Sequence, residues 1–235
     1  MFDADTLRAR AYYYEFLAFV FFYDEKGSGF LRWKGQLEHL SQSALSVADE
    51  AAFNTLKEHD FDKFINEQNS VLFDLSYANI PLNASFYEDG RDDGAARLRV
   101  IELLKKSDYR RNLSRCKDSE DFIGFVFLFS SQLLLDASGG ASEMISIQEE
   151  LFKSVINPFI DEFIALLADH SEARFYAGIA QILSSFIALE RGLLGVGAPA
   201  SKARSIAREA MSKKPYQSKM PTPKSKLFWD EFTAL

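Results

Sequence analysis

Apolar residues recur every three or four positions along most of the chain, a spacing typical of amphipathic α-helices. The first predicted helix covers residues 5–23 and ends at the glycines of Gly27-Ser28-Gly29. Further helices are predicted over residues 30–45, from 49 to about 75, and over 95–106. The first half of the chain is therefore expected to be mainly helical.

The second half continues this pattern with longer apolar stretches. Residues 119–135, SEDFIGFVFLFSSQLLL, are apolar on nearly every side, which is typical of a central helix covered all round. A regular apolar stripe follows from Ile147 to Leu167, and Pro158 within it should kink or split the helix. Another amphipathic helix is predicted over residues 175–193, and a short helix after Pro199.

The chain shows neither strand alternation nor an internal repeat, so an all-α fold is predicted. We expect a single-domain bundle of roughly eight to ten helices around the central apolar helix, covering residues 1–211. Residues 212–235 differ, with three prolines in nine residues, and are predicted to form an extended, basic C-terminal tail. The apolar end of this tail, LFWDEF, is a candidate for docking back onto the domain.

One segment interrupts the helices, residues 80–91 with the sequence IPLNASFYEDGR. Pro81 favours an extended entry, and Gly90 permits a turn. Ser85 and Tyr87 offer side chains that can fix the backbone between them. We predict a loop with an apolar first half and an acidic turn. Loops that carry function are positioned by rigid scaffolds such as a helical bundle.

Composition narrows the class of protein. With 47% hydrophobic and 26% charged residues, the chain can bury a core and stay soluble. Its N-terminus, MFDADTLRAR, lacks the apolar run of a secretory signal. No uninterrupted apolar run approaches the roughly 20 residues that a membrane span needs. We therefore expect a cytoplasmic protein without stable membrane insertion.

The net charge of −7 is distributed unevenly. Residues 201–226 contain eight Lys or Arg and one Glu, whereas the remainder of the chain has a net charge of −14. An acidic body argues against a nucleic-acid ligand, because phosphate contacts need a clustered basic surface. A basic protein partner suits it better. The basic tail is either a contact for an acidic surface or a solvated end.

The residue patterns of common catalytic sites are missing. The chain has no phosphate-binding P-loop and no Gly-x-Ser-x-Gly nucleophile elbow. His39, His59 and His170 are isolated in sequence, and the one cysteine, Cys116, has no histidine nearby. We expect no catalytic residue, no metal site and no cofactor, and we predict that the protein is not an enzyme.

A cluster of acidic residues opens the central helix in KDSEDFIGF, residues 117–125. Asp118 or Ser119 can cap this helix. Glu120 and Asp121 are then in its first turn, where the backbone dipole favours negative charge. Helix capping explains these residues on its own, and a binding role is the alternative.

Four motifs, taken in order, resemble the TorD/DmsD/NarJ-like family of chaperones for molybdenum enzymes. They are RAYYYEFLAFVFF, VLFDLSYANIPLNASFYEDG, DSEDFIGFVFLFSSQLL, and the pair LFKSVINPFIDEFIALL and ARFYAGIAQILSSFIALE. They look like the family's Arg/Tyr-rich first helix, its Pro-x-x-x-Ser-x-Tyr segment, its Glu-Pro-x-Asp-His motif, and its helix kinked at a Pro-aromatic pair. The likeness covers roughly residues 8–194. Asp121 retains the aspartate of the third motif, whereas Phe122 replaces its histidine.

The resemblance implies an all-helical, non-catalytic chaperone that binds the twin-arginine signal peptide of a molybdopterin oxidoreductase. Such a protein holds the apo catalytic subunit in the cytoplasm until the cofactor is inserted. A receptor for a peptide that is both basic and apolar needs carboxylates beside an apolar groove. The candidate peptide-binding residues are Leu72, Phe73, Pro81, Ser85, Tyr87, Glu88, Asp89, Asp121, Phe122, Phe125 and Tyr176.

Two other functions stay open at this point. A helical adaptor would bridge larger proteins through its surface and its C-terminal tail. A helical enzyme would need a convergent polar pocket, which the sequence does not locate. The resemblance leaves the client open among molybdoenzymes of the formate dehydrogenase and the S- or N-oxide reductase types, and it leaves open whether the chaperone is a monomer or a helix-swapped dimer.

Overall fold

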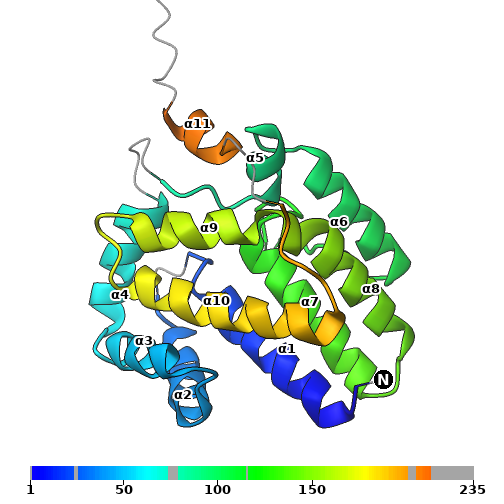
Figure 1. Ribbon diagram of the computed structural model, residues 1–235, viewed down its shortest axis with the longest axis horizontal. Helices are drawn as coiled ribbons and strands as arrows, with labels where there is room; N and C mark the ends of the chain where they lie inside the picture. Colours follow the sequence, from blue (N-terminus) through cyan, green and yellow to red (C-terminus); the bar gives the residue numbers. More distant parts are fainter. Residues whose placement is uncertain (1, 24–25, 74–78, 115, 201–204, 213–235) are drawn as a thin grey trace, which may run out of the picture.

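A computed structural model describes the whole chain except residues 1, 24–25, 74–78, 115, 201–204 and 213–235. The described residues form a bundle of α-helices (Figure 1), which confirms the predicted all-α fold. The helices are α1 (Ala4–Phe19), α2 (Phe30–Leu40), α3 (Val47–Lys57), α4 (Phe61–Gln68), α5 (Ala84–Asp89), α6 (Ala95–Lys106), α7 (Ile123–Ser138), α8 (Glu143–Leu151), α9 (Asn157–Asp169), α10 (Phe175–Leu194) and α11 (Ile206–Ser212). The predicted tail lies outside the described residues from position 213 onward, so its separation from the domain and its docking stay predictions.

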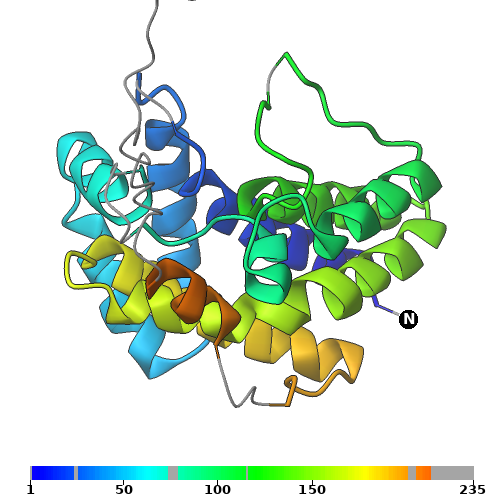
Figure 2. The same cartoon turned by 90° about the horizontal axis from the view of Figure 1, so that it is seen from above.

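The core of the bundle is built around α1 and α7, which pack along each other. α10 packs against α3 and α9 and also contacts α1, while α8 packs against α7. Figure 2 shows α2 to α4 at one end of the molecule and α6 to α8 at the other. Aromatic rings fill much of the interior; for example, the rings of Phe16 and Trp33 stack with centroids 5.3 Å apart.

A buried ion pair joins α1 to α10. Arg10 is 2% exposed and Glu190 is fully buried, and Arg10 Nε lies 2.6 Å from Glu190 Oε1. The Tyr14 hydroxyl donates to Glu190 at 2.8 Å, and Arg10 Nη2 donates to Gln148 of α8 at 2.8 Å. Burial lowers the pKa of Arg10, but the hydrogen bond and charge of Glu190 outweigh burial and raise this pKa above its ordinary value. The cluster therefore sets how α1, α8 and α10 meet.

α1 ends at Phe19, earlier than the predicted boundary at residue 23. The carbonyls just beyond this end find side-chain donors. Gln68 Nε2 donates to the Val20 carbonyl at 2.9 Å and to the Phe22 carbonyl at 3.0 Å. The Tyr176 hydroxyl donates to the Val20 carbonyl at 2.6 Å. Because carbonyls at a helix end lack partners within the helix, these donors take the place of a further turn.

The helix predicted from residue 49 to about 75 is divided in the structure, so this prediction is wrong. α3 ends at Lys57, and Asp60 begins α4 as its N-cap by accepting from the Lys63 amide at 2.9 Å. A π-helical turn, Asn69–Phe73, extends α4, and residues 74–78 lie outside the described chain. The apolar spacing runs on through the break, and only the capping aspartate marks it.

The predicted split at Pro158 is confirmed. α8 is followed by a π-helical turn, Phe152–Ile156, and α9 begins at Asn157 with Pro158 in its first turn. Proline has no N–H to donate, so the wider turn before it accommodates the missing hydrogen bond.

α7 differs from its prediction at its start and on one face. It begins at Ile123, after the acidic residues that were predicted to lie in its first turn. Most of its side chains are buried, but Leu128 is 41% exposed and Leu135 is 44% exposed. Half-buried Phe125 lies on the same face. The expectation of a helix covered on every side is therefore wrong for this stripe.

α10 is, among the described residues, the one helix that is long and apolar enough to cross a membrane, with 20 residues and a mean hydropathy of 1.3 over an 18-residue window. In the structure it contacts α1, α3 and α9, and it carries the buried Glu190. A core helix of a soluble protein passes the same test, so this finding is weak evidence for a membrane span.

Candidate functional site

The segment that interrupts the helices, residues 79–83, is extended and pairs with the chain just before α7. We call it the Pro81 segment. The Ile123 amide donates to the Leu82 carbonyl at 2.8 Å, and the Ala84 amide donates to the Asp121 carbonyl at 3.0 Å. Asn83 and Phe122 form an isolated antiparallel β-bridge between the two strands of this contact. Two stretches that are far apart in sequence are thereby held together by the backbone.

The side chain of Asp121 reinforces this contact. Asp121 is fully buried, and its Oδ2 accepts a hydrogen bond from the Ser85 amide at 2.9 Å. The Ser119 hydroxyl donates to the other carboxylate oxygen. Asn83, the N-cap residue of α5, makes no side-chain capping bond, so Asp121 caps α5 from outside that helix. The predicted place of Asp121 in the first turn of α7 is thus corrected: it caps α5 instead.

The predicted loop after Pro81 contains a short helix, α5, so the expectation of a loop throughout residues 80–91 is wrong. Tyr87 of α5 is fully buried, and its hydroxyl donates to the Pro81 carbonyl at 2.8 Å. Burial raises the pKa of Tyr87 well above its ordinary value, so this hydroxyl keeps its proton. Ser85 Oγ accepts from the Arg97 amide at 3.3 Å. Both side chains fix the backbone, as the sequence predicts.

A groove of about 500 Å³ lies along the Pro81 segment, and we call it the Pro81 groove. It is lined by Leu72, Asn79, Ile80, Pro81, Leu82, Asn83, Phe86, Asp92, Ala210 and Met211. Most of these side chains are apolar, and they come from the end of α4, the Pro81 segment, α5 and α11. Asp92 is the lining residue with a charge. It is exposed, and its Oδ1 accepts from Asn83 Nδ2 at 2.9 Å.

The acidic turn, residues 88–93, begins with the last two residues of α5 and continues beside this groove. Glu88 forms an ion pair with Arg99 of α6. Asp89 Oδ2 accepts from the Ala95 amide at 2.9 Å, at the first turn of α6. A Cβ on Gly94 would lie 1.9 Å from that same oxygen, so a larger residue there would push the Asp89 carboxylate away from the Ala95 amide. Of the acidic residues around the groove, the sequence singled out Glu88 and Asp89 and missed Asp92, which belongs to the same turn.

Glu120 lies between two arginines at the start of the paired segment. Its carboxylate contacts Arg97 Nε at 2.7 Å and Arg111 Nε at 3.0 Å. Burial raises the pKa of Glu120, but the hydrogen bond from Arg97 and the charge of Arg111 outweigh it and leave this pKa below its ordinary value. Glu120 is therefore ionised at neutral pH and already neutralised by protein groups.

The structure brings together some of the predicted peptide-binding residues and separates others. Leu72 and Pro81 line the Pro81 groove, and Ser85, Tyr87 and Asp121 support it from behind. Phe73 contacts Tyr23, with ring centroids 5.4 Å apart. Phe122 is 3% exposed, and its ring packs edge-on against that of Phe22 with centroids 5.1 Å apart. The aromatic ring at this position therefore contributes to the core. Tyr176 is fully buried in the core, where it caps the end of α1.

Phe125 belongs to a second groove, of about 320 Å³, on the exposed stripe of α7. We call it the α7 groove. It is lined by Glu15, Leu104, Tyr109, Arg110, Phe125, Leu128, Phe129, Ser131, Gln132 and Leu135. This groove and the Pro81 groove share no lining residue. The predicted residues therefore divide between two surfaces.

Fold and site together define an all-helical domain with apolar surface grooves, and its described residues contain no group of three His, Cys, Asp or Glu side chains placed to hold a metal ion. Residues 34–165, more than half of the chain, match the family model of the nitrate reductase delta subunit. The chain belongs to this family of NarJ/TorD-type chaperones, which serve the maturation of molybdoenzymes. No individual curated protein matches the chain. The matched range includes the Pro81 segment, the acidic turn and Asp121.

Proposed function

We propose that this chaperone binds the twin-arginine leader of a molybdoenzyme catalytic subunit in the Pro81 groove and holds the apo form for cofactor insertion. Family membership supports the general role in maturation. The observation that carries the proposal is the groove itself, whose apolar walls end at Asp92. A leader of this class joins a basic stretch to an apolar stretch, so it needs both features in one place.

Apolar leader side chains contact the walls of the groove in this proposal. Leu82 and Phe86 are half-buried, so each still offers apolar surface to a ligand. Leu72 and Pro81 complete the wall. Backbone pairing holds the Pro81 segment against residues 119–123, so the groove is formed before a ligand arrives. A preformed groove costs less ordering entropy on binding.

The charged part of the leader meets the acidic turn. Asp92 has Asn83 as its hydrogen-bond partner, and an arginine guanidinium can bind its other oxygen at the exposed edge. Glu88 and Asp89 contribute to the local negative field, although each has a protein partner of its own. Ser85, Tyr87 and Asp121 position the segment, while Phe73 packs against Tyr23 and Phe122 against Phe22. Phe125 and Tyr176 lie outside this proposed site.

The client is a molybdoenzyme catalytic subunit, and the family's name favours one of the nitrate reductase type. Formate dehydrogenases and S- or N-oxide reductases are the other candidate clients. A twin-arginine leader is accessible before export, so a protein that binds it acts in the cytoplasm.

Titration of the full chain with twin-arginine leader peptides tests the proposal. Each leader is paired with a Lys-Lys version, because a lysine ammonium lacks the planar, forked set of donors that an arginine guanidinium offers to a carboxylate. We expect Leu82→Asp to weaken binding by about tenfold or more, since it puts a charge into the apolar wall. Leu135→Asp, a matched change in the α7 groove, should leave the affinity unchanged. Failure of the wild-type chain to bind any leader from its own genome contradicts the proposal.

The α7 groove is the observation that favours a second function, that of an adaptor for larger proteins. Its exposed Leu128 and Leu135 form an apolar stripe beside Glu15 and Gln132. The same pair of variants separates the two functions. Loss of client capture in Leu135→Asp, with leader binding retained, assigns the client's folded body to the α7 groove.

A further inference from the structure

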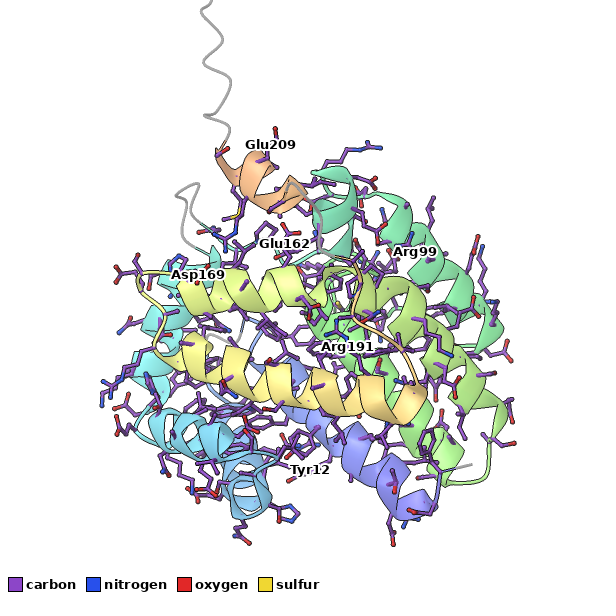
Figure 3. All side chains as sticks on the ribbon, viewed as in Figure 1. Tyr12, Arg99, Glu162, Asp169, Arg191 and Glu209 are labelled. Carbon is purple, nitrogen blue, oxygen red and sulfur yellow. The ribbon has the colours of Figure 1, made fainter. Side chains whose placement is uncertain are left out.

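α11 holds the end of the described chain against the Pro81 groove. Ala207 is fully buried, and the Arg208 guanidinium lies 2.6 Å from the Asp169 carboxylate at the end of α9. The Ser205 hydroxyl donates to Glu162, which Figure 3 shows on α9 beside α11. Ala210 and Met211 line the groove. The chain therefore leaves the described part of the structure at the wall of the proposed peptide site.

The residues that follow have the chemistry of the peptide that the groove is proposed to bind. Residues 213–226 contain five lysines and no acidic residue, and Leu227, Phe228 and Trp229 come next. A basic stretch followed by an apolar stretch is also the order of charge and hydrophobicity in a twin-arginine leader. The acidic turn beside the groove contains Glu88, Asp89, Asp92 and Asp93. Arg99 and Arg97 of α6 pair with Glu88 and Asp93, so Asp92, which accepts from the Asn83 side-chain amide, is the carboxylate that the groove offers to a basic segment.

The length of this segment allows it to reach the groove. Leu227 lies fifteen positions after Ser212, and an extended chain of that length spans up to about 50 Å. A tethered segment also has an effective concentration in the millimolar range, so even a weak contact is well populated.

We propose that residues 224–232, KSKLFWDEF, occupy the Pro81 groove of their own chain when no client is bound, and that a leader must displace them. The part of this inference that concerns displacement by a leader rests on the proposed function. The tail then acts as an internal competitor, which lowers the apparent affinity for leaders and keeps an apolar groove covered between clients. A client with a fitting leader outcompetes it, whereas weakly basic or weakly apolar peptides do not.

The experiment uses full-length chains. In the test variant, Leu227, Phe228 and Trp229 are all replaced by Ser, and in the control variant Tyr216 and Met220 are replaced by Ser in the same tail. We expect leader affinity to rise about tenfold in the test variant and to stay unchanged in the control. Without the competing tail segment, a larger fraction of the molecules has an empty groove that can bind a leader. An unchanged affinity in the test variant overturns the inference and leaves leader binding intact.

A second measurement does not depend on leaders. A synthetic peptide of residues 213–235 is titrated into the test variant and into the same variant carrying Leu82→Asp. We expect binding to the first and a loss of about tenfold or more in the second. Binding of this peptide without binding of any leader overturns the proposed function and keeps the tail in the groove. Absence of peptide binding overturns the tail inference. A wild-type dimer that dissociates in the test variant overturns it too, since the tail then occupies the groove of a second copy.

Discussion

Asp121 caps a helix to which it does not belong: its carboxylate, two residues before α7, accepts from the Ser85 amide of α5 at 2.9 Å. The same residue accepts from the Ala84 amide through its backbone carbonyl at 3.0 Å. One residue thus fixes both the entry of α5 and the register of the Pro81 segment.

Replacing Asp121 by Ala is expected to lower the free energy of unfolding by about 1–3 kcal/mol, because the buried Ser85 amide loses its acceptor. Asp121→Asn should lose less, since an amide oxygen can still accept from Ser85. Urea unfolding of both variants measures this. Asp118→Ala, at an exposed carboxylate nearby, is the control. Equal stability of Asp121→Ala and wild type contradicts the capping role.

Helix boundaries were predictable from the sequence where residues within the helix itself determine them. α6 was predicted over its observed range, and the split at Pro158 follows from the missing N–H of proline. The break between α3 and α4 was missed, because the apolar spacing continues across it. The start of α7 was misplaced because Asp121 has its partner in α5, and such a pairing depends on tertiary structure.

The sequence predicted some of the residues that line the Pro81 groove, but it did not predict which charges around the groove are already paired. The sequence placed Leu72 and Pro81 together, and both line the groove. It could not show that Arg99 neutralises Glu88, since that pairing follows from the packing of α5 on α6. Asp92 was passed over among several acids in one turn. Phe125 and Tyr176 were assigned to the site through a resemblance, and the structure puts them on a different groove and in the core.

Asp92→Asn is expected to weaken leader binding by about threefold at low salt, because an exposed charge pair contributes less than about 1 kcal/mol. The difference from wild type should shrink as salt is added, since exposed charges are screened. Isothermal titration at two salt concentrations measures both effects. Asp5→Asn makes the same charge change at an exposed site on α1. An equal loss in Asp5→Asn shows a general field effect and contradicts a local role for Asp92.

Tyr176→Phe is expected to cost about 1 kcal/mol of stability and to leave leader affinity unchanged, because its hydroxyl donates to the Val20 carbonyl in the core. Gln68 still donates to that carbonyl, so the loss should be moderate. Tyr23→Phe, at a tyrosine that is 50% exposed, is the control for thermal or urea unfolding. If Tyr176→Phe reduces leader binding while its stability is unchanged, the result contradicts a purely structural role and indicates that Tyr176 contributes to the binding site.

Arg10→Met is expected to lower the free energy of unfolding by about 3–5 kcal/mol, because Glu190 is left as a buried charge without its partner. The double variant Arg10→Met with Glu190→Leu should recover much of this loss. Chemical unfolding of the single and double variants gives the coupling free energy. Arg8→Met, whose partner Asp5 is exposed, should change little. Additive losses in the double variant argue against a coupled pair.

Stability is expected to fall at alkaline pH through buried tyrosines. Burial, with a smaller contribution from the charge of Asp49, raises the pKa of Tyr13 to about 12 from the value of 10.0 for a free side chain. The folded form therefore keeps a proton that the unfolded chain releases. The contribution is complete below pH 10 and is lost as the pH rises toward 12. The unfolding free energy of wild type should therefore fall relative to that of Tyr13→Phe between pH 9 and pH 11, and a difference that stays constant over this range contradicts the titration of Tyr13.

The buried pair of Arg10 and Glu190 also fixes an order of events during synthesis. These residues are 180 positions apart, and at bacterial translation speeds roughly 10 to 40 s pass between their emergence from the ribosome. During the first part of that interval α1 also lacks α7, which supplies the Ser131 hydroxyl bonded to the Ala11 carbonyl, and α10 is complete only at its end. The nascent chain exposes its most aromatic helix until its last long helix is made. The nascent chain is therefore expected to expose apolar surface of the kind that general chaperones bind until α10 has been made.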